Sequence, residues 1–220
     1  RYVNPGMNIL LTDYNRPIYK DAMLPAGRLR EPLSGKKRAN IMIVSKCPSD
    51  LSRDEAGLII EKLSPEHGQS IYFTTLLYGN LTMVHKEYAS DTQAAERPLS
   101  SLRKDEHVIL LTGIATPEKL IHDISIYTDN IQSVRFADHH QFTEKEIKNL
   151  NALFERSGTD SIVITTEKDA TRLMSLPLSK ELKSHLYTLP IEVKILFEKE
   201  HEFNNQILNY VRTDSRNNSP

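Results

Sequence analysis

Short apolar runs alternate with helix-start signals along this chain, and the alternation constrains its fold more than any other feature. Each run has the length of a β-strand and is too short for a core helix. The expected strands lie at residues 9–11, 41–44, 70–77, 108–111, 134–136, 161–165, 186–189 and 193–197. Strands that alternate with helices form mostly parallel sheets with helices on both faces. The sequence therefore predicts an α/β fold.

Two capping boxes and a proline mark where helices start. Ser52 and Thr143 are each followed three residues later by a glutamate, which is the capping-box pattern. Pro117 suits the first position of another helix. We expect helices from 52 with Leu58, Ile59 and Leu63 on its apolar face, from 117, and at 143–156, 167–174 and 201–211.

A polar stretch without clear periodicity separates two regular regions. It contains Gly79-Asn80, Pro98 and several serines, which are turn and linker residues. We expect two lobes joined by an extended linker, which carries at most a hairpin. The predicted division is a first domain at residues 1–80, a linker at 81–105, a smaller α/β domain at 106–212 and a disordered polar tail at 213–220.

Composition places the chain among ordinary globular proteins. Its 220 residues carry a net charge of −1, with 39% hydrophobic and 26% charged residues. One cysteine, Cys47, excludes an internal disulfide and fits a reducing compartment. No apolar run approaches the roughly 18–20 residues that cross a bilayer.

The loop after the first expected strand is the strongest candidate for a binding site. Residues 12–32 show little helical or strand periodicity. Ligands of open α/β sheets bind just beyond the carboxyl ends of the strands, and the planar fork of arginine matches phosphate oxygens two at a time. The alternative is a solvated surface loop. The residues that favour a phosphate site are Asp13, Arg16, Gly27, Arg28, Arg30 and Glu31.

Positive charge is concentrated around this loop. From residue 16 to residue 46 there are eight basic and two acidic side chains, a local net charge of +6. Such a segment indicates an anionic ligand, an anionic membrane surface or a nucleic acid. We do not expect nucleic acid, because the nearby tyrosines do not alternate with the basic residues as a stacking platform would. The neighbouring Met23 and Leu24 could touch acyl chains at a membrane. Residues 36–38 are expected to form a solvated basic turn.

Polar residues also follow the other expected strands. Asp138-His139-His140 comes directly after one of them, and a carboxylate beside an imidazole suits acid–base work. The alternative is a helix-entry loop with exposed histidines. Three further strand ends could contact a nucleotide, or could serve as turns and helix caps. They carry Lys46, Thr112-Gly113, and Thr166, Glu167 and Lys168.

Several of these stretches resemble one family in the same order along the chain. They are LLTDYNRP followed by LPAGRLREP (10–32), IMIVSKCP (41–48), LLTGIATP (110–117), FADHHQFT (136–143) and ITTEKDATRL (164–173). Together they resemble the tetraacyldisaccharide 4'-kinases, the lipid A 4'-kinases of Gram-negative bacteria. The resemblance implies a P-loop-kinase-like fold. No GxxxxGK[ST] phosphate loop occurs in the sequence, so the chain looks like the carboxy-terminal two-thirds of such a kinase and is expected to be inactive by itself.

The resemblance also implies a reaction and roles for residues. The γ-phosphoryl group of ATP, with Mg²⁺, would pass to the 4'-hydroxyl of a tetraacylated disaccharide 1-phosphate at the cytoplasmic face of the inner membrane. His139, supported by Asp138, would assist the base, His140 would be dispensable, and Glu31 would hold the metal. The substrate or phosphates would bind Asp13, Arg16, Gly27, Arg28 and Arg30, and the nucleotide would bind Lys46, Thr112, Gly113, Thr166, Glu167 and Lys168.

Two other functions remain open from the residues alone. The first is a non-catalytic α/β module that binds an anion or a nucleotide. The second is a metal-dependent hydrolase that uses Asp138 and His139. The hydrolase needs further ligands, and no HxH or HxxxH spacing near these residues supplies them.

Overall fold

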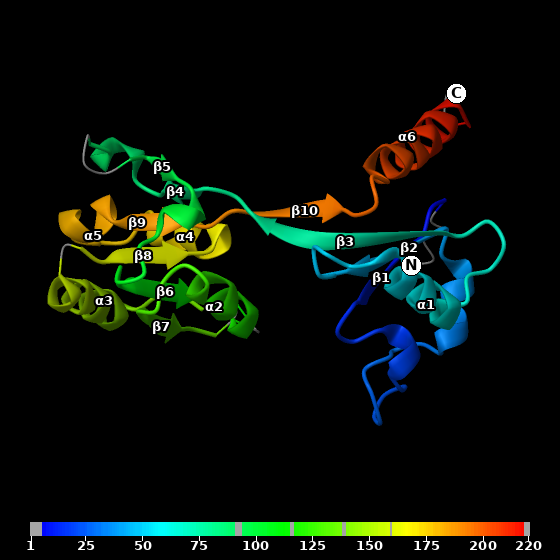
Figure 1. Cartoon of the computed structure of the whole chain (residues 1–220), viewed down its shortest axis with the longest axis horizontal. Coiled ribbons are helices and arrows are strands. Elements are labelled where there is room, and N and C mark those ends of the chain that lie inside the picture. Colours follow the sequence, from blue (N-terminus) through cyan, green and yellow to red (C-terminus); the bar gives the residue numbers. More distant parts are fainter. Residues whose placement is uncertain (1–5, 91–93, 115–116, 138–139, 159, 218–220) are drawn as a thin grey trace. The chain divides into compact units, whose positions relative to one another are not determined.

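The computed structural model describes residues 6–90, 94–114, 117–137, 140–158 and 160–217. The chain forms two compact units, coloured along the sequence in Figure 1. Unit 1 comprises Arg1–Leu77 and Val193–Pro220, and unit 2 comprises Tyr78–Glu192. The chain therefore passes twice from one unit to the other, and each unit has its own sheet and core.

The sheet of unit 1 has the order β1-β2-β3-β10. Its strands are β1 (Ile9–Asp13), β2 (Ile41–Ser45), β3 (Ser70–Tyr78) and β10 (Ile191–Ile195). The first three are parallel, with Leu11, Ile43 and Tyr72 side by side in register. β10 runs antiparallel to β3, because hydrogen bonds join Leu196 N to Phe73 O and Gly79 N to Pro190 O.

Helix α1 (Arg53–Leu63) packs on one face of this sheet. The predicted capping box is confirmed: the Glu55 amide donates to Ser52 Oγ at 3.2 Å, and the Ser52 amide donates to Glu55 Oε2 at 3.1 Å. Ala56, Ile59 and Leu63 face the core, since residues three and four apart share a face of a helix. The prediction for Leu58 was wrong, because this side chain is 55% exposed.

Helix α6 (Glu200–Asn217) contacts Tyr72 of β3. The Phe203 ring meets the Tyr72 ring edge-on at 5.1 Å, and the Tyr72 hydroxyl donates to Gln206 Oε1 at 2.9 Å. The helix runs to Asn217, so residues 213–217 are helical where the sequence predicts a disordered tail. No proline or glycine interrupts the chain between 212 and 217, which permits the helix to continue.

Strand β1 is more exposed than the sequence predicts. Ile9 is 41% and Leu11 is 63% exposed, although both belong to the apolar run that we expected to be a buried strand. The cause is position, since β1 is an edge strand of the four-stranded sheet. A short apolar run thus predicted the strand but not its burial.

The sheet of unit 2 has the order β5-β4-β9-β8-β6-β7. Neighbours among β9, β8, β6 and β7 are parallel, and β4 is antiparallel to β5 and β9. The strands are β4 (Leu81–Met83), β5 (Glu96–Arg97), β6 (Val108–Thr112), β7 (Ile131–Arg135), β8 (Ile162–Thr165) and β9 (Leu186–Thr188), and the α-helices are α2 (Glu118–Ser125), α3 (Glu144–Ser157), α4 (Glu167–Leu173) and α5 (Lys180–Ser184). Short 3₁₀ turns occur in both units, at η1 (Ile18–Lys20), η2 (Leu33–Arg38), η3 (Lys86–Tyr88) and η4 (Leu99–Ser101).

Helices cover both faces of this second sheet. All five residues of β6 are buried, and successive residues point to opposite faces. Val108 and Leu110 lie in the core cluster that contains Leu120 and Ile124 of α2. Ile109 and Leu111 lie in the cluster formed with α3, α4 and α5. The predicted α/β fold with mostly parallel strands is therefore confirmed.

Residues 81–105, which the sequence predicts to be a linker, pack into unit 2. Arg97 makes two hydrogen bonds of 2.9 Å to the carboxylate of the buried Glu106. Residues 193–217 pack with unit 1 rather than with the second half of the chain. These units are defined by contacts, and the division into domains stays a prediction. The core residues within the 81–105 stretch are Leu81, Met83, Leu99 and Leu102.

Within the described part of the chain, no helix combines the length and the apolar character needed to span a bilayer.

Candidate functional site

The carboxyl ends of β1 and β2 carry a paired acid and base. Asp13 ends β1, and its Oδ2 lies 2.7 Å from Lys46 Nζ, just beyond β2. Burial tends to raise the pKa of Asp13, but hydrogen bonds from Lys46 and from the Asn15 amide outweigh it, so the pKa is lowered. Lys46 has a φ of 60°, a left-handed conformation that is costly for a lysine. Two predicted site residues are thus brought together, and each neutralises the other's charge.

The loop after β1 is built around the Asp21 carboxylate. Asp21 Oδ1 accepts hydrogen bonds from the Ala22 amide at 2.8 Å and the Arg28 amide at 3.1 Å. The Gly27 amide donates to the Met23 carbonyl at 3.0 Å. A Cβ atom on Gly27 would lie 2.2 Å from the Ala22 carbonyl oxygen, closer than any side chain tolerates. Gly27 therefore permits the tight turn that precedes Arg28.

Three cationic side chains of this loop surround one hollow of about 330 Å³, here called the arginine hollow. Among the described residues, no carboxylate lies within ion-pair distance of any of the three. The sequence predicted Arg16, Gly27 and Arg28 but missed Lys20, although Lys20 follows Arg16 by four residues in the same basic segment. The arginine hollow is lined by Asn15, Arg16, Pro17, Lys20, Asp21, Gly27 and Arg28.

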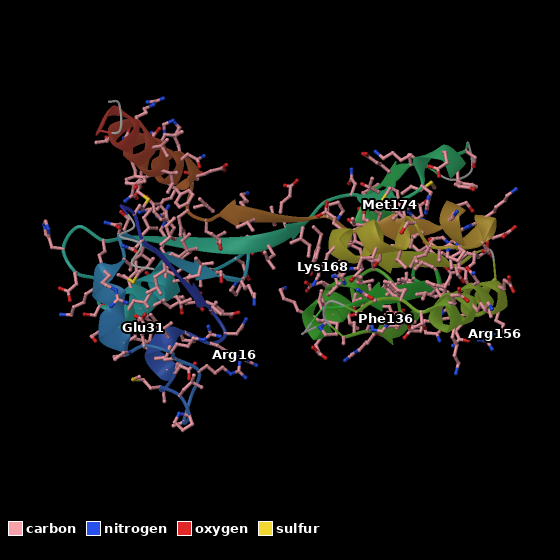
Figure 2. The ribbon with its side chains drawn as sticks, turned by 180° about the vertical axis from the view of Figure 1, so that it is seen from behind. Arg16, Glu31, Phe136, Arg156, Lys168 and Met174 are labelled. Atoms are coloured by element: carbon pink, nitrogen blue, oxygen red, sulfur yellow. The ribbon has the colours of Figure 1, made fainter. Side chains whose placement is uncertain are left out.

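A second hollow of about 310 Å³ lies along the following segment and contains Arg30 and Glu31. The Glu31 carboxylate accepts a hydrogen bond from Arg38, a partner that the sequence did not suggest. Lys36 Nζ donates to the Ser64 carbonyl at 2.8 Å, so it binds the C-terminal end of α1. Figure 2 labels Arg16 and Glu31 on the segment that carries both hollows.

The second hollow suits phosphate more than a bare metal ion. Arg30, Lys36 and Arg38 outnumber the one carboxylate, Glu31. In the described part of the chain, no three His, Cys, Asp or Glu side chains are arranged to hold a metal. Magnesium is nevertheless commonly bound by one or two carboxylates together with waters and substrate phosphates. Glu31 therefore fits a magnesium ion that arrives with a nucleotide.

In unit 2, loops from three parallel strands meet at one edge of the sheet. The Gly113 amide, after β6, donates to Asp169 Oδ2 at 2.8 Å, and the Thr166 hydroxyl, after β8, donates to the same oxygen at 2.8 Å. Asp169 is 1% exposed. A Cβ on Gly113 would lie 3.0 Å from Asp169 Oδ1 and 3.3 Å from the carbonyl of Ala137, which follows β7. Gly113 therefore allows these three loops to pack closely.

The predicted nucleotide contacts of unit 2 differ in exposure. The Thr112 side chain is fully buried, and Thr166 is the N-cap of α4. Glu167 and Lys168, in the first turn of α4, are exposed. Figure 2 shows Lys168 at the other end of unit 2 from Arg156, the last basic residue of α3. Glu167 and Lys168 are thus the members of this set whose side chains face solvent.

The predicted catalytic pair, Asp138 and His139, lies outside the described residues, and the described His140 follows it. The His140 ring stacks on Phe136 at 4.9 Å with an interplanar angle of 20°, and its Nε2 lies 2.9 Å from Glu146 Oε2. Hydrogen bonds from Thr143 and His140 lower the pKa of Glu146 to about 2. Glu146 also completes the predicted capping box of α3, which is confirmed. The sequence predicts no role in chemistry for His140. In the structure its ring is hydrogen-bonded to Glu146, in the first turn of α3.

Comparisons with known proteins show the family to which the chain belongs. The family profile described as tetraacyldisaccharide-1-P 4'-kinase matches residues 1–212. The tetraacyldisaccharide 4'-kinases of Bacteroides thetaiotaomicron and Phocaeicola vulgatus are each 44% identical over the whole chain. The same enzyme of Flavobacterium psychrophilum is 35% identical over 99% of the chain. The chain spans 58–59% of the length of these three relatives. The chain belongs to the tetraacyldisaccharide-1-P 4'-kinase family.

Proposed function

We propose that this family member takes part in transfer of the γ-phosphoryl group of ATP to the 4'-hydroxyl of a tetraacylated disaccharide 1-phosphate in lipid A biosynthesis. The observation that carries the proposal is the arginine hollow. Arg16, Lys20 and Arg28 converge there without a carboxylate partner among the described residues, and Gly27 makes the turn possible. Exposed cations without a carboxylate partner are suited to binding phosphate.

The phosphate transfer itself needs charge stabilisation and positioning. In such a reaction the substrate hydroxyl oxygen bonds to the γ-phosphorus, the bond to the β,γ-bridging oxygen breaks, and the hydroxyl proton passes to a base. In this proposal Arg28 and Arg30 neutralise the phosphate oxygens, and Arg16 and Asp13 help to position the substrate. Positive charge would lower the activation barrier most where negative charge develops in the transition state.

Further residue roles belong to the same proposal. Glu31 would hold Mg²⁺ together with nucleotide phosphates, and the bound ion would supply further charge neutralisation. Arg38, which bonds Glu31, would keep the carboxylate oriented. His139 would assist the base with Asp138 as its support. The proposed nucleotide-contacting residues are Lys46, Thr112, Gly113, Thr166, Glu167 and Lys168.

An acylated substrate also implies a location. We propose peripheral association with the cytoplasmic face of the inner membrane, where such a lipid would be reached. The local charge of +6 between residues 16 and 46 supports attraction to an anionic surface. Nucleic acid is not a proposed partner.

The test is a kinase assay on the protein as its gene encodes it, with ATP, Mg²⁺ and detergent-dispersed tetraacyldisaccharide 1-phosphate. Arg28→Ala and His139→Ala should each lower kcat/KM by at least about tenfold, since one charged or proton-transferring group is typically worth that much or more. Arg28→Lys should recover part of the loss, because it restores charge without the planar fork.

Arg156→Ala is the matched control, since Arg156 is an exposed arginine of unit 2 whose Nε bonds its own helix. Its kcat/KM should equal that of the wild type. Binding of ATP or inorganic phosphate without any phosphoryl transfer by the wild type would instead favour a non-catalytic anion-binding module. Activity that is unchanged in Arg28→Ala and His139→Ala would keep the reaction and reject these residue roles.

A further inference from the structure

The tip of the loop after β1 is a continuous apolar surface. Residues 22–26, with the sequence AMLPA, are all exposed. Met23 is 45% and Leu24 is 58% exposed. Apolar side chains exposed singly are common on any protein, but five consecutive exposed apolar residues at a loop end are a feature that membrane-binding surfaces share.

Backbone hydrogen bonds fix the shape of this tip. The Leu24 amide donates to the Leu29 carbonyl, and the Leu29 amide donates to the Ala22 carbonyl, both at 3.0 Å. Gly27 and Asp21 close the base of the loop, as described above. The apolar side chains are therefore presented by an ordered backbone, so that little conformational entropy is lost when they enter an apolar phase.

Cations surround the base of the same loop. Arg16, Lys20, Arg28 and Arg30 are exposed, and among the described residues no carboxylate oxygen lies within 4 Å of the charged group of any of the four. An apolar end beside unpaired basic residues is complementary to a bilayer interface, where acyl chains lie next to anionic phosphates. A water-soluble anion would use the cations but would leave the apolar tip exposed.

We propose that residues 22–26 insert into the interface of an anionic lipid bilayer, and that the net positive charge of residues 16–46 attracts this loop to the anionic headgroups. The inference deepens the proposed membrane association by assigning it to one loop. Insertion of residues 22–26 would place the arginine hollow at the level of the headgroups, where the sugar of a phosphorylated glycolipid also lies. The occupant is the bilayer itself and not a single acyl chain of the substrate.

Insertion can be measured with a fluorophore attached to the loop tip. Leu24→Cys offers an exposed thiol, whereas the natural Cys47 is 3% exposed and remains unlabelled. An environment-sensitive dye at position 24 should shift its emission to shorter wavelength when vesicles of phosphatidylglycerol and phosphatidylcholine are added. Vesicles of phosphatidylcholine alone should give a smaller shift. The matched control is Met174→Cys, at an exposed methionine of unit 2 (55% exposed), and its emission should stay unchanged.

Vesicle co-sedimentation tests the same surface without a label. The double variant Met23→Ser, Leu24→Ser should bind anionic vesicles at least about tenfold more weakly than the wild type, and Met174→Ser should bind like the wild type. Arg16→Gln with Lys20→Gln should weaken binding and reduce its dependence on salt. Circular dichroism must show that each variant is folded as the wild type is.

Either equal emission shifts at positions 24 and 174 or unchanged vesicle binding by the double serine variant would overturn the proposal. Neither readout needs turnover, so the two proposals can fail separately. A protein that inserts position 24 but transfers no phosphate would refute the proposed reaction alone. A protein that phosphorylates detergent-dispersed substrate but does not insert position 24 would refute the membrane loop alone.

Discussion

The loop after β1 in unit 1 and the sheet edge in unit 2 use charged residues in opposite ways. In the loop, Arg16 and Arg28 are exposed, while the Asp21 carboxylate bonds the backbone. At the sheet edge, the Asp169 carboxylate is enclosed and bonds the Gly113 amide and the Thr166 hydroxyl. Both regions lie beyond the carboxyl ends of parallel strands, so strand position alone does not distinguish them.

The difference separates residues that are available to a ligand from residues that build the site. An exposed, unpaired cation loses little when an anion binds, whereas a buried carboxylate with two donors cannot be redirected without leaving those donors unpaired. Substitutions in the loop should therefore change binding more than stability. Substitutions at the sheet edge should change stability first.

The largest effect that tests this contrast is expected from Asp169→Ala. The change leaves the Gly113 amide and the Thr166 hydroxyl without their acceptor in a buried place, which costs roughly 2–4 kcal/mol of unfolding free energy. Urea denaturation followed by circular dichroism measures it. Asp105→Ala, at a side chain that is 85% exposed, should change the unfolding free energy by less than about 0.5 kcal/mol. Equal stability of both variants would contradict the structural role of Asp169.

A smaller effect is expected from alanine at two glycines of unit 1. Gly27→Ala places Cβ against the Ala22 carbonyl and should destabilise by roughly 1–3 kcal/mol, together with a loss of anion affinity. Gly57→Ala, within α1, meets no atom within 4 Å and should stabilise by roughly 0.5–1 kcal/mol. Thermal unfolding compares the two variants. If Gly27→Ala were as stable as the wild type and bound phosphate equally, the loop would not depend on this turn.

The smallest effect is expected in the acid range, at Glu146. Its pKa in the folded protein is about 2, below the ordinary value of about 4.3. The lowered pKa means that the stabilisation is present above the ordinary pKa and is lost as the pH falls through about 2. The melting temperature of Glu146→Gln should therefore approach that of the wild type as the pH falls from about 5 to about 2. Glu155→Gln, at an exposed glutamate of the same helix, is the matched control, and a difference between Glu146→Gln and the wild type that did not shrink between pH 5 and pH 2 would contradict this role of Glu146.

Local sequence determined most of the secondary structure and part of the site. The capping boxes at Ser52 and Thr143 were predictable because their partners lie three residues away. The cluster of Arg16, Gly27 and Arg28 was predictable because one loop carries all three, and loop residues near in sequence remain near in space. The α/β class followed from the alternation of strands and helices, which does not depend on which strands are neighbours.

Tertiary structure alone decided burial, partners and the grouping of distant segments. Ile9 and Leu11 of β1 are exposed at the edge of the sheet, Leu81, Met83, Leu99 and Leu102 of the expected linker join the core of unit 2, and Glu31 bonds Arg38. Asp169 meets Gly113 across 56 positions of sequence. Such contacts depend on the order of strands in a sheet, and strand order is set by the packing of the whole unit. The sequence therefore named most of the charged residues of the candidate site but not Lys20, and the fold decided which of them are paired, as Asp13 is with Lys46 and Glu31 with Arg38.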